Sequence, residues 1–170
     1  MRHWLRVVGV AGAVLALIGS VPARAGENGD PPFLAFSAGA FDMNDTETTP
    51  EFRVEYRSDF RQYYLTPMVG LMVNGKGGVY GYGGVFMDIF LGRRFVITPN
   101  FAIGGYRQGH SKDLGSTIEF RSGVEIAYRF DNRSRFGIAF QHISNASIDD
   151  NNPGTESLVL TYAVPLDTLF

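Results

Sequence analysis

Alternating apolar and polar side chains mark one segment of the chain most clearly. Between residues 115 and 132, large apolar side chains such as Ile118, Ile126 and Tyr128 occupy even positions, whereas Glu and Arg side chains occupy odd positions. A period of two with one apolar and one charged face indicates a β-strand. The charged face would point to water in a soluble sandwich, but into the lumen in a transmembrane barrel whose apolar face meets lipid.

The same alternation recurs along the chain and predicts eight strands separated by turn-forming residues. We expect them near Phe33–Met43, Phe52–Arg57, Tyr64–Asn74, Val79–Leu91, Phe95–Arg107, Ser116–Phe130, Arg135–Asn145 and Glu156–Leu166. Because no later apolar run reaches the roughly 20 residues that a spanning helix needs, the chain could enter a membrane only as a closed barrel. An even strand number, with short turns mostly alternating with longer polar loops, is typical of outer-membrane barrels. The sequence therefore predicts an all-β fold, an eight-stranded antiparallel transmembrane β-barrel.

Residues 1–25 have the pattern of a secretory signal peptide. Arginines at the start precede a short apolar core, and Ala23-Arg24-Ala25 supplies the small-x-small pattern of a cleavage site. The apolar core is about a dozen residues long, too short to span a bilayer as a helix. We therefore expect export, with residues 26–170 forming a single barrel domain in the bacterial outer membrane.

Composition argues against several kinds of site. The chain has no cysteine, which leaves no disulfide framework and no thiolate metal site. Its formal net charge of -2 gives no footprint for nucleic-acid binding. His110, Asp149 and Asp150 lie in polar loops without the spacing of a metal-ligand cluster. We expect neither a cofactor nor a metal. Charged residues of the lumen-facing parity are expected to be salt-bridge partners: Arg53, Glu55, Arg57, Glu119, Arg121, Glu125 and Arg129.

Two polar side chains in the seventh predicted strand share the lipid-facing parity. Alternate apolar residues of that strand lead up to His142 and Ser144, so both are expected outside the barrel. Glu156 shares the outward parity of the eighth strand, and a simple hairpin register places it opposite His142. The same register pairs further outward residues: Phe140 with Leu158, Ile138 with Leu160, and Phe136 with Tyr162. Opposed residues have β-carbons about 4.5 to 5.5 Å apart, so the three polar side chains could form one hydrogen-bonded line.

The residue types in this line suit acyl transfer to water. A serine hydroxyl needs a base to take its proton, and a carboxylate orients that base, which assigns nucleophile, base and orienting roles to Ser144, His142 and Glu156. Backbone N–H groups near Asn145 and Ala146, or the Asn145 side chain, are candidate donors to the anionic intermediate. Strand rise and tilt place His142 roughly 18 Å above the periplasmic turn, and Ser144 close to the outer-leaflet interface.

The segment from His142 to Ile148, followed by Asn152 to Glu156, resembles the lipid A 3-O-deacylase (PagL) family. The resemblance rests on the H-x-S-N-A core and on a glutamate twelve residues after the serine, and it is concentrated in residues 115–162. It implies an eight-stranded barrel whose Ser144, His142 and Glu156 hydrolyse the acyl chain esterified at the 3-position of lipid A. The substrate and surroundings it implies are lipopolysaccharide and the outer membrane.

Two other functions stay open from the sequence. One is a non-catalytic structural or adhesive barrel, and the other is an acyltransferase that passes the chain to another acceptor. A homodimer formed through the lipid-facing walls is a further possibility, although no residue argues for it.

Overall fold

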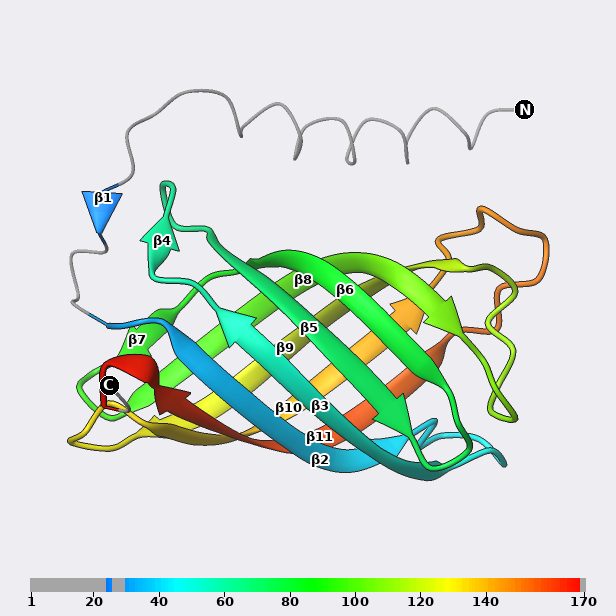
Figure 1. Cartoon of the computed structure of the whole chain (residues 1–170), viewed down its shortest axis with the longest axis horizontal. Coiled ribbons are helices and arrows are strands. Elements are labelled where there is room, and N and C mark those ends of the chain that lie inside the picture. Colours follow the sequence, from blue (N-terminus) through cyan, green and yellow to red (C-terminus); the bar gives the residue numbers. More distant parts are fainter. Residues whose placement is uncertain (1–23, 26–29, 169–170) are drawn as a thin grey trace.

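Eight antiparallel strands close into a barrel in the computed structural model, which describes residues 24–25 and 30–168. The barrel strands are β2 (Phe33–Phe41), β3 (Thr49–Arg57), β5 (Thr66–Asn74), β6 (Val79–Phe86), β8 (Phe95–Arg107), β9 (Ile118–Arg129), β10 (Arg135–Ser144) and β11 (Thr155–Pro165). Each pairs with its neighbours in chain order, and β11 also pairs with β2, which closes the cylinder (Figure 1). The all-β, eight-stranded prediction is confirmed.

Three short strands and one helical turn complete the described chain. Strand β1 (Arg24–Ala25) pairs with β4 (Phe60–Arg61), β7 (Ile89–Leu91) pairs with the start of β8, and a 3-10 helix covers Leu166–Thr168. The rest of the predicted signal peptide lies outside the described residues. No helix in the described part of the chain is long and apolar enough to cross a bilayer.

Several strand ends differ from the prediction, each for a local reason. Strand β3 begins at Thr49 rather than Phe52, with Pro50 on its exposed face. Strand β5 begins at Thr66 rather than Tyr64, because Tyr63 takes a left-handed conformation (φ 57) in the hairpin tip. The long strand expected from Val79 stops at Phe86, because Asp88 turns inward to accept a hydrogen bond from Thr98.

The two ends of the barrel differ in their connections. One end, which we call the loop end, carries the connections 42–48, 75–78, 108–117 and 145–154. The other, the turn end, carries the connections 58–65, 87–94 and 130–134 and both ends of the barrel sequence, where Leu166 N–H donates to the Pro32 carbonyl. Figure 1 shows the orange loop between β10 and β11 extending beyond the strands at the loop end.

The outer wall is apolar. Its exposed large side chains include Phe36, Phe52, Val54, Val69, Leu71, Ile103, Ile126, Phe136, Ile138, Phe140, Leu160 and Tyr162. Tyr63 and Tyr64 are the most exposed aromatic side chains of the described residues, at 67% and 73%, and they lie at the turn end. An apolar band with aromatic residues at its border is typical of a barrel that crosses a membrane.

The lumen holds the charged residues that the sequence assigned to it, but Glu119 is not the salt-bridge partner that was expected, because neither of its buried carboxylate oxygens has a hydrogen-bond partner within the described residues. Arg57 donates to both carboxylate oxygens of Glu125, at 3.2 and 2.7 Å, and to Glu55 at 2.8 Å. Arg121 also binds Glu55, at 3.0 Å. These side chains are all buried, so the ion pairs replace the hydration that each charge has lost.

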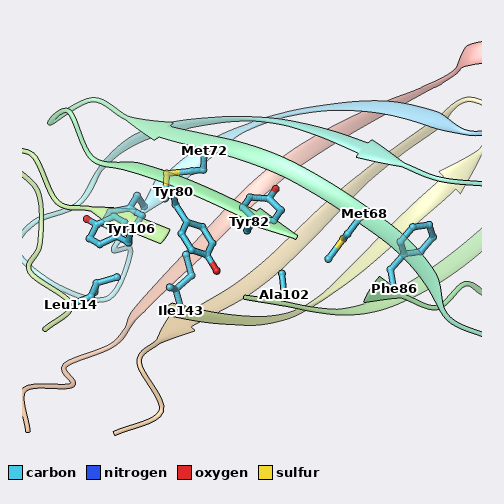
Figure 2. Close-up of a cluster of buried hydrophobic side chains, with 10 residues drawn as sticks. Met68, Met72, Tyr80, Tyr82, Phe86, Ala102, Tyr106, Leu114 and Ile143 are labelled. Carbon is cyan, nitrogen blue, oxygen red and sulfur yellow. The ribbon is translucent and has the colours of Figure 1, made fainter. Parts of the chain in front are cut away.

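A cluster of buried apolar side chains runs along the lumen, from Leu114 at the loop end to Phe86 near the turn end (Figure 2). Its members are Phe41, Met68, Met72, Tyr80, Tyr82, Phe86, Ala102, Tyr106, Leu114 and Ile143. Leu114 enters the cluster from the β8–β9 loop, and Ile143 enters from β10. Because Ile143 is fully buried, the residues before and after it must point to the outer wall.

Candidate functional site

His142 and Glu156 meet on the outer wall. Strands β10 and β11 pair in the register that the sequence predicted, with His142 opposite Glu156, and His142 Nδ1 lies 3.0 Å from Glu156 Oε1. Their side chains are 42% and 29% exposed, so the pair is open to a ligand from outside the barrel. An ionised carboxylate can only accept, which assigns the imidazole proton to Nδ1 and leaves Nε2 as a base.

Ser144 lies two residues beyond His142 on the same strand and the same face. The inward turn of Ile143 between them gives both side chains the outward direction, and both are half-buried. The Ser144 hydroxyl makes no hydrogen bond within residues 30–168 and is free to approach a substrate. Hydrogen bonds between a nucleophile and its base are often long until substrate binds.

Asn145 organises the loop that follows Ser144. Its buried Nδ2 donates to the carbonyls of Leu114 and Asn151, at 3.0 and 2.8 Å, and its Oδ1 accepts from Ser147 N–H at 2.9 Å. Ala146 and Ser147 both take left-handed conformations, with φ of 53 and 63. Backbone conformations that cost energy for residues other than glycine persist where surrounding contacts hold them, often at functional sites.

Several N–H groups of this loop are already bonded. Asn145 N–H donates to Asn152 Oδ1 at 3.1 Å, and Ile148 N–H donates to the Asn145 carbonyl at 3.1 Å. Within residues 30–168, Ala146 N–H has no acceptor, and neither does the Asn152 amide Nδ2. Of the two supports that the sequence suggested, Ala146 therefore keeps a free donor and Asn145 is used to hold the loop. Asn152 could not be found from the sequence, because it lies in a polar loop without any period.

Gly154 leaves no free space for a side chain beside the His142 ring. It has a φ of 64, and a β-carbon placed on it would lie 3.0 Å from His142 Cε1 and 3.6 Å from Nε2. The left-handed backbone and the closeness of the imidazole thus both favour glycine at this position. The ring has the Glu156 carboxylate at Nδ1, and the chain passes close to it at Gly154.

A second serine also neighbours His142. The register of β9 and β10 places Ser122 opposite His142, and Ser122 is exposed on the outer wall. The alternation of the sequence does not single out this hydroxyl, because it does not fix the register of β9 against β10.

The remaining candidates are not brought to this site. His110, Asp149 and Asp150 are exposed in loops, and residues 30–168 contain no group of three His, Cys, Asp or Glu side chains that could hold a metal ion.

The barrel presents a histidine, a carboxylate and a serine on its outer wall. It therefore belongs to the class of barrels whose polar site is open to the surrounding lipid. The family model of the Lipid A 3-O-deacylase (PagL) matches residues 52–165, and the chain belongs to this family. The resemblance drawn from the sequence is confirmed.

Two relatives agree with this family. The lipid A deacylase PagL of Pseudomonas aeruginosa is 34% identical over 65 residues, covering 38% of this chain and 37% of the relative. The lipid A deacylase PagL of Bordetella bronchiseptica is 33% identical over 51 residues, covering 30% of this chain and 29% of the relative. The matched part thus spans about a third of each relative's length.

Two solved structures share the fold. The crystal structure of the outer membrane enzyme PagL superposes with a TM-score of 0.61 at 19% identity, over 78% of this chain and 99% of that one. A de novo designed transmembrane β-barrel superposes with a TM-score of 0.56 at 12% identity, over 78% and 94%. These likenesses concern the barrel alone.

Proposed function

We propose that this protein is a lipid A 3-O-deacylase of the bacterial outer membrane. It removes an ester-linked acyl chain, with Ser144 as nucleophile, His142 as base and Glu156 as the residue that orients the base. The observation that carries the proposal is the 3.0 Å contact between His142 Nδ1 and Glu156 Oε1 on the outward face, in line with Ser144.

The first half of the reaction forms an acyl-enzyme. His142 Nε2 takes the hydroxyl proton as Ser144 Oγ attacks the ester carbonyl, and Glu156 stabilises the imidazolium that results. Ala146 N–H and Asn152 Nδ2, for which no acceptor is found within residues 30–168, are the candidate donors to the anionic oxygen. The proton then passes from Nε2 to the leaving sugar oxygen, and the ester bond of the substrate breaks.

The second half regenerates the enzyme. Water, which reaches the site from the loop end, loses a proton to His142 Nε2 and attacks the acyl-serine carbonyl. The products are a free fatty acid and the restored Ser144 hydroxyl. All three proposed residues come from one chain, so the chemistry needs no second barrel.

The location of the site supports a lipid substrate. His142 and Ser144 end a strand whose outward residues below them are Phe136, Ile138 and Phe140. Acyl chains would contact this apolar wall while the ester lies at the level of the polar site. The choice of lipid A, and of its 3-position, comes from the family rather than from this geometry.

The test is product analysis with purified variants. The protein, folded in detergent or vesicles, is incubated with lipid A, and lipid and fatty acid are followed by mass spectrometry. Ser144→Ala should lower turnover at least about 10⁴-fold, as expected for loss of a nucleophile. Ser122→Ala is the matched control, because it removes the other hydroxyl beside His142, and it should keep most of the activity.

Four outcomes would contradict the proposal in different ways. Full activity in Ser144→Ala would exclude that nucleophile, and loss of activity only in Ser122→Ala would move the role across to β9. A newly acylated lipid in place of free fatty acid would identify an acyltransferase. A wild-type protein that leaves lipid A intact would favour a structural barrel.

A further inference from the structure

Thr155 connects the outer-wall site to the inside of the barrel. It lies between Gly154 and Glu156, and its own side chain is fully buried and directed inward. Its hydroxyl donates to Asp42 Oδ1 at 3.0 Å. Asp42 belongs to the loop after β2, so this bond joins the start of β11 to a segment more than a hundred residues away.

Asp42 is itself firmly held. Its side chain is fully buried, and Oδ1 also accepts from Lys112 Nζ at 2.8 Å. Lys112 reaches Asp45 as well, at 3.1 Å. Burial alone would lower the pKa of Lys112, but its hydrogen bonds to Asp42 and Asp45 outweigh that effect and raise the pKa above its usual value.

A backbone bond adds to the same connection. Met43 N–H donates to the carbonyl of Glu156 at 3.0 Å. The loop that carries Asp42 is thus bonded to two successive residues of β11, one through a side chain and one through the backbone.

The residues on either side of Thr155 both lie beside His142. A β-carbon added to Gly154 would lie 3.0 Å from Cε1 of the ring, and Glu156 binds Nδ1. Thr155 is the first residue of β11, so an inward anchor there fixes the outward direction of Glu156 and the point at which the chain enters the strand from Gly154. A shift of Thr155 would move both neighbours of the imidazole together.

We propose that Asp42, held by Lys112 and acting through Thr155, is a positioning residue for His142 and Glu156. The inference rests on the function proposed above. It adds a buried carboxylate, on the luminal side of the wall, that sets the geometry of a site on the lipid side.

The barrel offers a chemically matched control at its other end. Thr98 Oγ1 donates to Asp88 Oδ1 at 2.8 Å, and Asp88 Oδ2 accepts from Arg135 at 2.8 Å. Here too a buried threonine donates a hydrogen bond to an aspartate whose side chain is buried and also binds a cation. This pair lies at the turn end, away from His142. Thr98→Val therefore removes the same kind of bond without touching the site.

The experiment compares Thr155→Val, Thr155→Ser and Thr98→Val in the full-length protein. We expect Thr155→Val to lower kcat about 10- to 100-fold with little change in KM, because misplacement of a catalytic group by about 1 Å has effects of this size. Thr155→Ser keeps the hydroxyl and should restore most of kcat. The kcat of Thr98→Val should stay within about twofold of the wild-type value. The KM of all three variants should also stay within about twofold of the wild-type value. Asp42→Ala should repeat the effect of Thr155→Val, and the double variant should lose no more than either alone.

A second measurement follows the imidazole directly. Proton NMR of protein with ¹⁵N-labelled histidine detects the hydrogen-bonded Nδ1–H of His142, which is assigned with a His142→Gln variant. The resonance should shift or broaden in Thr155→Val and stay unchanged in Thr98→Val.

The NMR result separates this inference from the proposed function. An unchanged His142 resonance in Thr155→Val would overturn the inference, whatever the activity. Equal loss of kcat in Thr155→Val and Thr98→Val would also overturn it, because general destabilisation would then explain both. If the His142 resonance shifts in Thr155→Val but the wild-type protein hydrolyses no ester, the positioning contact would be supported and the proposed reaction rejected.

Discussion

Replacing Gly154 by alanine tests how the His142 ring is held. The new β-carbon would lie 3.0 Å from His142 Cε1 and 3.5 Å from the Ile143 carbonyl oxygen. Carbon atoms in good contact are about 3.5 to 4.0 Å apart, so the ring or the loop must give way by a few tenths of an ångström. The left-handed backbone at φ 64 adds about 1 to 2 kcal/mol for a residue with a side chain.

These two effects act on different observables. The backbone cost lowers stability by about 1 to 2 kcal/mol and leaves the barrel folded. The displacement of His142 acts on chemistry, and we expect kcat to fall about 10- to 100-fold. Gly92→Ala is the matched control, because Gly92 has a φ of 68 but nothing within 4 Å of its added β-carbon.

The assay is release of fatty acid from lipid A by both variants, with folding checked by the heat-induced shift in gel mobility that closed barrels show. Gly92→Ala should match Gly154→Ala in stability and match wild type in kcat. A Gly154→Ala protein as active as Gly92→Ala would refute the idea that this backbone fixes the imidazole.

Three further predictions concern the barrel around the site. Arg135→Met should lower the free energy of unfolding by about 3 to 5 kcal/mol in a denaturant titration, because Asp88 would keep a buried charge without its cation and Asp30 would be left with Arg129 alone; an unchanged midpoint would contradict this. Phe136→Arg places a charge on the exposed outer wall and should cost about 2 to 4 kcal/mol when folding is measured in vesicles, with no such cost if the wall does not face lipid. Because the pKa of Lys112 is raised above 10.5, its contribution to stability is fully present below that pH and is lost as the pH rises through the raised value; limited proteolysis of loop 108–117 should therefore increase only in strongly alkaline buffer.

The sequence predicted the barrel and the outer pair of the site for a shared physical reason. A strand with one lipid face and one charged face imposes a strict period of two, and that period fixed the outward direction of His142 and Ser144. The simple hairpin register that matches every outward residue to another places His142 opposite Glu156, and the structure has this register. The sequence pattern therefore predicts the structure correctly in the strands, where buried and exposed side chains alternate.

The parts that the sequence did not predict depend on contacts between distant loops. Asp42 and Lys112 are brought to Thr155 only when three loops meet at one end of the cylinder. The role of Gly154 depends on the His142 imidazole beside it, and the role of Asn152 depends on the hydrogen bond that its side chain accepts from Asn145 N–H. None of these residues belongs to a periodic pattern, so their roles follow from closure of the barrel.

Covalent labelling measures most directly whether Ser144 is an activated nucleophile on the lipid side of the wall. A long-chain alkyl fluorophosphonate, added to the folded protein in membranes, reacts with a serine whose proton is taken by a neighbouring base. Peptide mass spectrometry should find the adduct on Ser144, and the adduct should be lost in His142→Gln. An adduct on Ser122, or an unmodified Ser144 in a protein that still cleaves lipid A, would contradict the proposed site.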